Sequence, residues 1–294
     1  MVYAGQGDAR RSMSLLWRTE RPEQPRRTPG PGPKPGLSVD AIVTAAIAVA
    51  DREGMAALSM RAVGERLGRT AMALYTYVPS KGELLDLMYD AVHAELPRAY
   101  PDFTGGPAGS DEGRADGADW RAGLTAWARD TLEFHLHHPW VLQISQARPV
   151  LGPHEYAALD TLVRLLNGTG LEARLVRRLV GTLTHFVRGC AGTVAEARQA
   201  AAVTGESDEE WWFARSSLLG EVAPDFADRY PDLSAMERAG TSAPSSAEGT
   251  DDQDRTDDTE AVPFLEREAR KTFTVGLGVL LDGIETAVQR TDAA

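Results

Sequence analysis

The chain has 294 residues, of which 43% are hydrophobic, with one cysteine and a formal net charge of −12. This length leaves room for two domains with buried cores, and the single Cys190 excludes a disulfide within the chain. No run of 18 apolar residues occurs, and residues 1–36 lack the apolar segment of a signal peptide, so we expect a cytoplasmic protein with no membrane partner.

The acidic charge is unevenly distributed along the chain. Residues 1–81 carry a net charge of +5, whereas residues 82–294 carry −17. Contacts with nucleic-acid phosphates require lysine and arginine, so the overall acidity counts against nucleic-acid binding, but the basic N-terminal part permits it.

Residues 1–36 are poor in aliphatic side chains and end in a Pro/Gly-rich run that follows Arg26-Arg27. Such a composition does not support a packed core, so we expect a disordered basic arm. Two roles remain open for it: a solvated terminus, or an arm that lies along DNA phosphates or enters the minor groove.

The strongest local signals follow. A first helix is predicted between Ser38 as its N-cap and Gly54 as its stop. Two short helical patterns then meet at Gly68, the first capped by Ser59 and the second by Thr70. The second is short and buries little besides a leucine, so its outward face is available to a partner. This pattern predicts a helix-turn-helix, whose second helix fits the major groove of DNA.

A further helix is predicted to start at a capping box formed by Ser80 and Glu83. Lys81 lies in its first turn, where a positive charge opposes the helix dipole, so we interpret this lysine as a ligand for an outside anion such as phosphate.

The succession from Leu37 to about Leu96 resembles the DNA-binding domain of TetR-family transcriptional repressors. The resemblance rests on the helix-turn-helix, on Leu74-Tyr75-Thr76-Tyr77-Val78 and on the run that starts at Lys81-Gly82-Glu83. It implies an all-α fold with an N-terminal DNA-binding domain at 37–96. It also implies that the DNA-contacting residues are Arg61, Thr70, Ala71, Ala73, Tyr75, Tyr77 and Lys81. Thr76 joins this predicted set because the helical pattern places it on the same outward face.

Two positions depart from the family pattern. Arg69 stands where a buried aliphatic residue is usual, so it either extends outward or adds a phosphate contact. Gly64 replaces an alanine at the close approach of the two helices. The alternative interpretation is an ordinary half-buried role for Tyr75 and Tyr77 and a solvated surface role for Arg61 and Lys81.

Beyond a flexible connection at 97–119, the pattern is again helical over 120–290. Helices are predicted from Trp120 to Pro139, at about 154–166, at 172–200, after a capping box at Ser207 and Glu210, and at 264–288. The Trp211-Trp212-Phe213 cluster is predicted to be buried. Residues 237–262 hold eight acidic and two basic residues and are predicted to form a mobile linker.

No catalytic motif is present, so an enzyme is a secondary alternative. His135 and His138 are three residues apart on one predicted helix, but no further metal ligands complete the pattern, and we predict neither metal nor cofactor.

The resemblance implies that the second region binds a small-molecule effector and dimerises through helices at about 172–200 and 264–288. The sequence therefore predicts a homodimeric repressor that an unknown effector releases from a palindromic operator in double-stranded DNA. A helical interaction protein without an operator is the other alternative. The expected cavity wall comprises Trp127, Phe134, His135, Trp140, Gln143, His185 and Phe186, and a place in the plain core is the alternative for each of them.

Overall fold

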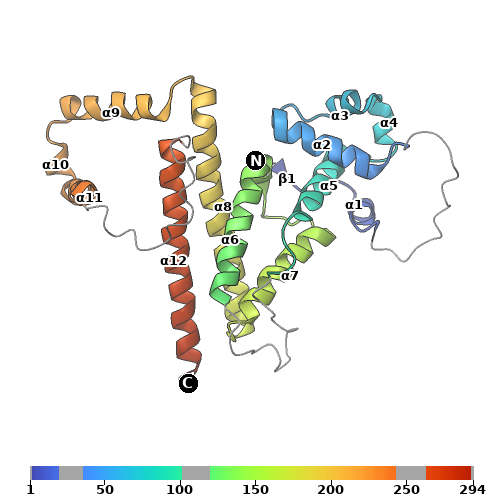
Figure 1. The fold of residues 1–294 in the computed structure, drawn as a ribbon. Coiled ribbons are helices and arrows are strands. Elements are labelled where there is room, and N and C mark those ends of the chain that lie inside the picture. The colour runs from blue at the N-terminus through green and yellow to red at the C-terminus, as the bar shows by residue number, and fades with distance from the viewer. Residues whose placement is uncertain (1, 20–35, 101–119, 243–262, 293–294) are drawn as a thin grey trace. The chain divides into compact units, whose positions relative to one another are not determined.

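The computed structural model describes residues 2–19, 36–100, 120–242 and 263–292 (Figure 1). Within these ranges helices dominate, which confirms the all-α fold, and β1 (Val2–Tyr3) and β2 (Ile144–Ser145) add one short parallel pair. The chain divides into two compact units, residues 1–192 with 273–294, and residues 193–272. None of the helices in the described ranges combines the length and hydropathy needed to cross a membrane.

Four helices build the helix-turn-helix domain: α2 (Val39–Glu53), α3 (Met60–Leu67), α4 (Ala71–Tyr75) and α5 (Lys81–His93). Each begins at the predicted cap. The Oγ of Ser38 accepts a backbone hydrogen bond of 3.1 Å, as does that of Ser59, and Thr70 Oγ1 accepts one of 3.3 Å. Gly68 ends α3 with φ at +64°, the left-handed conformation that glycine adopts without strain.

A single apolar core holds these helices together. Ile42, Val63, Leu74, Leu84 and Met88 are fully buried in it, so every helix of the domain contributes at least one side chain. α5 runs from the turn beside α4 toward the second domain, as Figure 1 shows. It therefore belongs structurally to both regions.

The N-terminal segment is ordered where the structure describes it, so the predicted disorder is wrong for residues 2–19. Helix α1 (Ala9–Leu16) is capped by Asp8, and Ala4 and Leu16 are buried at 4% and 3% exposure. The prediction failed because it averaged composition over 36 residues and gave too little weight to the few apolar side chains near the start. Residues 20–35 lie outside the described ranges.

α6 (Trp120–His137) starts the second domain and ends where the sequence places a proline. A 3₁₀ helix, η2 (Pro139–Gln143), leads to β2, and α7 (Pro153–Asn167) follows. Of the predicted connection at 97–119, residues 101–119 lie outside the described ranges.

Two long helices, α8 (Ala173–Thr204) and α12 (Phe264–Asp292), lie side by side (Figure 1). Phe186 stacks on Phe273 with ring centroids 5.9 Å apart and planes 16° apart. A Cβ on Gly276 would lie 2.7 Å from the Phe186 ring, so the ring would have to shift to admit a larger residue. One side of α12 is exposed in the single chain, where Val275 is 68% exposed and Val279 is 65% exposed.

The unit 193–272 contains α9 (Asp208–Val222), α10 (Phe226–Arg229) and α11 (Pro231–Ser242). The Ser207–Glu210 capping box is present. The predicted burial of its aromatic cluster is wrong for the single chain, since Phe213 is 75% exposed and Trp212 52%. The apolar side chains of α9 are distributed around the whole helix, so contact on one face leaves the others exposed. The predicted linker also starts too early, because 237–242 belong to α11, while 243–262 lie outside the described ranges.

Candidate functional site

The predicted DNA-contacting residues gather on α4 and its flanks. The side chains at its start, at its end and on the neighbouring helix starts are exposed, namely Arg61, Arg69, Thr70, Tyr75, Thr76, Tyr77 and Lys81. Ala71 and Ala73 are half-buried. The fold therefore brings the predicted set onto one short helix and the residues beside it, although Arg61 is engaged already: its Nε donates to Glu65 Oε1 at 2.8 Å.

Lys81 also makes a contact that sequence reasoning did not anticipate. Its Nζ donates a 2.7 Å hydrogen bond to the carbonyl oxygen of Leu58, which ties the start of α5 to the turn before α3. An ammonium has three donors, so two remain for an anion. The hydrogen bond to Leu58 therefore fixes the position of the Lys81 ammonium group beside α4.

Met72 is a candidate contact that the sequence analysis missed. It lies on α4 between the two half-buried alanines and is 75% exposed. The available signal was its position: the inward face of this helix is occupied by Leu74, so a methionine two residues earlier points elsewhere. A large apolar side chain exposed on a reading helix suits contact with thymine methyl groups.

Gly64 is required by the packing of the helix-turn-helix. A Cβ at this position would lie 2.7 Å from the backbone oxygen of Arg69 and 3.3 Å from the backbone nitrogen of Ala71. The departure from alanine therefore accompanies an unusually close approach of the turn to α3, at the point where the Arg69 N–H bonds the Gly64 carbonyl at 2.8 Å.

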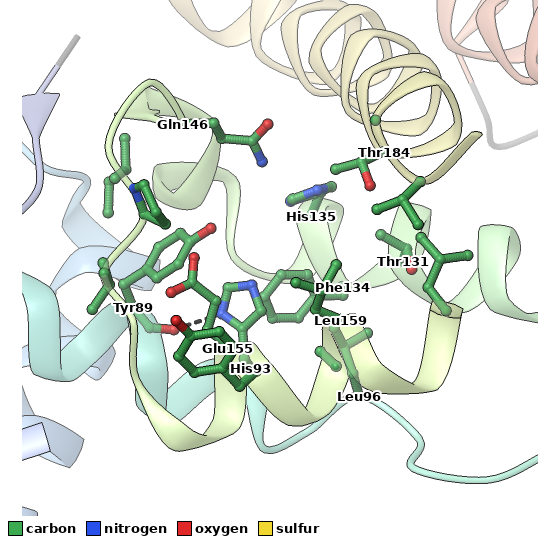
Figure 2. Close-up of a pocket in the computed structure, with 18 of the residues that line it drawn as sticks. Tyr89, His93, Leu96, Thr131, Phe134, His135, Gln146, Glu155, Leu159 and Thr184 are labelled. Carbon is green, nitrogen blue, oxygen red and sulfur yellow. Dashed lines mark hydrogen bonds between the residues drawn. The ribbon is translucent and has the colours of Figure 1, made fainter. Parts of the chain in front are cut away.

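A cavity of about 480 Å³ lies among α5, α6, α7 and α8 (Figure 2). Its size is in the range of small-molecule sites. Four of the seven predicted wall residues line it: Trp127, Phe134, His135 and His185. The α8 residues that reach it, such as Thr184 in Figure 2, precede residue 193, so the whole cavity lies within one compact unit.

The other three predicted wall residues lie elsewhere. Trp140 is buried against the end of α2, where its Nε1 donates to Asp51 Oδ1 at 2.7 Å. Gln143 is exposed on η2, and Phe186 faces Phe273. The helical segments that carry these three residues were predicted correctly. The direction in which each side chain points depends on turns and helix pairings, which the spacing of apolar residues along one helix does not specify.

Sequence reasoning missed the part of the wall that comes from α5 and α7. Tyr89 and His93 come from α5, and Glu155 and Tyr156 from α7; Figure 2 shows Tyr89, His93 and Glu155 grouped on one side of the cavity. The prediction assigned α5 wholly to DNA binding. The available signal was that α5 continues well beyond Leu84, the residue that packs in the core of the helix-turn-helix, so its far end reaches the second domain.

Burial disfavours the charged form of two of the three imidazoles that line the cavity, those of His93 and His135. Burial, which removes the ring from water, is the largest of the effects that lower the pKa of His93 to about 4. The Nδ1 of His93 donates a hydrogen bond of 2.6 Å to the Tyr89 carbonyl. Burial, followed by the nearby Arg188 charge, lowers the pKa of His135 to about 3. Burial also raises the pKa of Glu155. The wall therefore disfavours charge.

Two buried polar atoms on α6 have no hydrogen-bond partner among the described residues: His135 Nδ1 and Thr131 Oγ1. Buried polar atoms are normally paired, so these two are available to an occupant. The sequence had paired His135 with His138 as a possible metal face. The structure separates them, because His135 lines the cavity while His138 contacts Asp51 and Glu95.

A helix-turn-helix with an exposed reading helix, joined through α5 to a helical domain with a cavity, defines a DNA-binding transcriptional regulator. The chain belongs to the tetR family. The family profile "Bacterial regulatory proteins, tetR family" matches residues 42–88, and "Tetracyclin repressor-like, C-terminal domain" matches residues 113–255.

Individual relatives agree with this assignment. The HTH-type transcriptional repressor DrrR1 of Streptomyces coeruleorubidus is 39% identical over 234 residues, covering 79% of this chain and 78% of that protein. An HTH-type transcriptional regulator of Saccharopolyspora erythraea is 32% identical over 169 residues, 58% of this chain and 64% of the relative. The fold resembles apo ActR of Streptomyces coelicolor, with a TM-score of 0.61, 21% identity, and coverage of 88% of this chain and 100% of ActR. The chain is thus a TetR-family transcriptional repressor.

Proposed function

We propose that two copies of this repressor hold operator DNA through their α4 helices and release it when a small molecule fills the cavity. The observation that carries the proposal is the double role of α5. Its first residue, Lys81, lies beside the reading helix, and its far end supplies Tyr89 and His93 to the cavity wall. An occupant that binds better to one orientation of α5 shifts the population of DNA-binding chains.

In this proposal the contacts with DNA divide into two groups. The first group lies at the end of α4 or beside it and supplies positive charge or hydroxyl groups: Arg69, Tyr75, Tyr77 and Lys81. These residues bind phosphates and position the helix. Met72 is placed to contact base edges, where an apolar side chain distinguishes thymine by its methyl group. Specificity then rests on fit and apolar contact more than on hydrogen bonds.

Substitutions on the two groups are expected to act differently on DNA binding. Lys81→Ala is expected to weaken binding to operator and random DNA alike and to reduce the slope of log affinity against log salt by about 1. Met72→Ala is expected to weaken operator binding selectively, with an unchanged salt slope, because it removes no charge. Fluorescence anisotropy on both DNAs across a salt series measures these effects.

Arg290→Ala, which removes one exposed charge at the end of α12, is the matched control and is expected to leave DNA affinity unchanged. Because Lys81 also bonds Leu58, a thermal melt establishes that its variant is folded, and Arg69→Ala provides a second loss of charge. Unchanged salt slopes in both charge variants would show that the phosphate roles are wrong.

The cavity wall indicates the chemical class of the occupant. It is mostly apolar and aromatic, and its buried unpartnered atoms are neutral. A hydroxyl group can donate to or accept from either tautomer of His135, so the wall suits an uncharged aromatic molecule with a hydroxyl near this ring. ActR, which shares the fold, has been solved in complex with (S)-DNPA and with actinorhodin.

The effector role is tested by screening aromatic hydroxyl compounds for release of operator DNA. With a compound that releases DNA, His135→Phe is expected to weaken compound binding about 10-fold, the loss of one buried hydrogen bond, with operator affinity unchanged. Gln143→Ala, outside the cavity, is the control. Operator DNA must weaken compound binding by the factor with which the compound weakens operator binding. A compound that binds without altering operator affinity would contradict the release mechanism.

The homodimer of the proposal is supported by the exposed apolar surface of the long helices. Val275 and Val279 lie one turn apart on α12 and are largely exposed in the single chain. Pairing of α8 and α12 with the same helices of a second copy would cover them in a four-helix bundle. Such twofold symmetry matches the twofold symmetry of a palindromic operator.

A further inference from the structure

A second cluster of polar side chains lies at the end of α6, outside the cavity. His137 is the last residue of the helix, His138 follows it, and Glu95 follows the end of α5. One ligand atom from each of the three lies within 4.8 Å of the other two. His138 is 2% exposed, whereas Glu95 and His137 are exposed, so the cluster reaches from the interior to solvent.

The sequence explains why two adjacent histidines converge. Consecutive side chains on a helix do not face each other. The helical conformation stops after His137, however, because a residue that precedes proline is disfavoured in the helical region, and His138 adopts φ −119° and ψ 66° before Pro139. This turn brings the rings of His137 and His138 edge to face, with centroids 4.6 Å apart.

The hydrogen bonds of His138 leave one ring nitrogen facing an anion. Its Nδ1 lies 2.8 Å from Asp51 Oδ1, and its Nε2 lies 3.1 Å from Glu95 Oε2. In the neutral tautomer that donates its Nδ1 proton to Asp51, the Nε2 lone pair faces the Glu95 oxygen, and a cation between these two atoms would stabilise that arrangement. Two ligands of one tetrahedral zinc ion are about 3.3 Å apart, given metal–ligand distances near 2.0–2.1 Å.

We propose that Glu95, His137 and His138 form a binding site for a divalent transition metal, with Zn²⁺ the best fit. Two imidazoles and one carboxylate suit Zn²⁺, Co²⁺ or Ni²⁺ and do not suit Mg²⁺ or Ca²⁺, which prefer oxygen ligands alone. The exposed side of the cluster gives the ion its access and leaves a fourth position for water. This site is independent of the effector cavity and goes beyond the proposed release mechanism.

Asp51 acts as a positioning residue for this site. Metal-binding histidines commonly donate their other N–H to a carboxylate, which fixes the tautomer and the ring orientation, and Asp51 accepts from His138 in this way. Asp51 Oδ1 also accepts from Trp140 Nε1 at 2.7 Å, so two hydrogen bonds hold the same carboxylate oxygen. The metal would thereby join α2, the end of α5 and the end of α6.

The test is titration of the full chain with Zn²⁺ and Co²⁺. We expect one Zn²⁺ per chain by calorimetry, a rise in melting temperature on binding, and a visible absorption of bound Co²⁺ typical of tetrahedral coordination. His137→Ala and Glu95→Gln change exposed side chains and preserve the fold; each is expected to weaken binding by about 100-fold or more. Asp51→Asn is expected to weaken it 10–100-fold. His154→Ala, a histidine paired with Arg98 instead, is the control.

Absence of saturable Zn²⁺ binding would overturn the proposal, as would binding that survives both His137→Ala and Glu95→Gln. In either case His138 is a doubly hydrogen-bonded ring between two carboxylates and nothing more. Loss of binding in His154→Ala together with the other variants would also overturn it, because the ion would then be held by scattered surface histidines.

Discussion

Replacing Gly64 with valine is expected to abolish operator binding while the second domain stays folded. The added Cβ would lie 2.7 Å from the Arg69 backbone oxygen, closer than real Cβ contacts, and the two further methyl groups would add to the clash. Backbone atoms cannot move aside as a flexible side chain does. The turn must shift, and the reading helix that follows it at Thr70 shifts with it.

The clash at Gly64 and the helix propensity of the new residue act on stability in opposite directions. Glycine in a helix interior is less stable than alanine by about 1 kcal/mol, so Gly→Ala at an open site stabilises. At Gly64 the overpacking costs about 1–3 kcal/mol and outweighs that gain. A Cβ added at Gly220, in α9, would meet no atom within 4 Å, so Gly220→Ala is the matched control and is expected to be neutral or stabilising.

Thermal denaturation and anisotropy on operator DNA measure the two consequences. Gly64→Ala should give an intermediate loss of both stability and affinity, and Gly64→Val a complete loss of affinity. A Gly64→Val chain that melts at the original temperature and binds operator normally would show that the turn is more pliable than its packing indicates.

The helix-turn-helix was predictable because its signals are local. Ser38, Ser59, Thr70 and Ser80 each bond a backbone N–H two or three residues away, so the residue type and the position of the first turn determine the cap. The end of α3 is local in the same way, because a glycine at this position indicates a positive φ by its residue type alone. Interactions that span three or four residues are visible in the sequence without knowledge of the fold.

The cavity was predictable only in part, because its wall is assembled from distant segments. α6 presents Phe134 and His135 as its periodicity indicated, but Trp140 turned away after the Pro139 break and bonded Asp51, 89 residues earlier. Tyr89 reaches the cavity from a helix assigned to another domain. Such contacts depend on how helices pack against each other, which spacing along one helix does not determine.

The N-terminal segment shows the same limit and leads to the second large expected effect. Deletion of residues 2–19 is expected to lower stability and to weaken the response of operator binding to effector. On one side this segment contacts the DNA-binding helices: the Gly5 N–H donates to Asp86 Oδ1 on α5 at 3.0 Å, and Arg18 pairs with Asp40 on α2.

On its other side the same segment contacts elements of the cavity wall. Val2 and Tyr3 pair with β2, and the Nε1 of Trp17 donates to the Leu151 carbonyl at 3.0 Å. The Trp17 ring also lies 6.2 Å from that of Tyr156, a wall residue. Residues 2–19 thus connect the cavity with α2 and α5 by a route separate from α5 itself.

The stability effect is large because the contacts are buried. Leu16 is 3% exposed, and truncation of a buried leucine to alanine costs about 2–5 kcal/mol. Deletion also removes the Gly5 N–H, whose hydrogen bond to Asp86 Oδ1 lowers the pKa of this carboxyl against the raising effect of burial. Met13→Ala is the matched control for Leu16→Ala, since Met13 lies on the exposed side of α1 at 37%.

Two measurements distinguish a structural role from a coupling role. Melting temperature reports the first, and is expected to fall for the deletion and for Leu16→Ala but not for Met13→Ala. The ratio of operator dissociation constants with and without effector reports the second. Allosteric factors are commonly about 5–150-fold, and loss of one of two connecting routes is expected to reduce the factor severalfold. A deletion variant that melts lower yet keeps the full ratio would assign these residues to stability alone and leave α5 as the connection between cavity and reading helix.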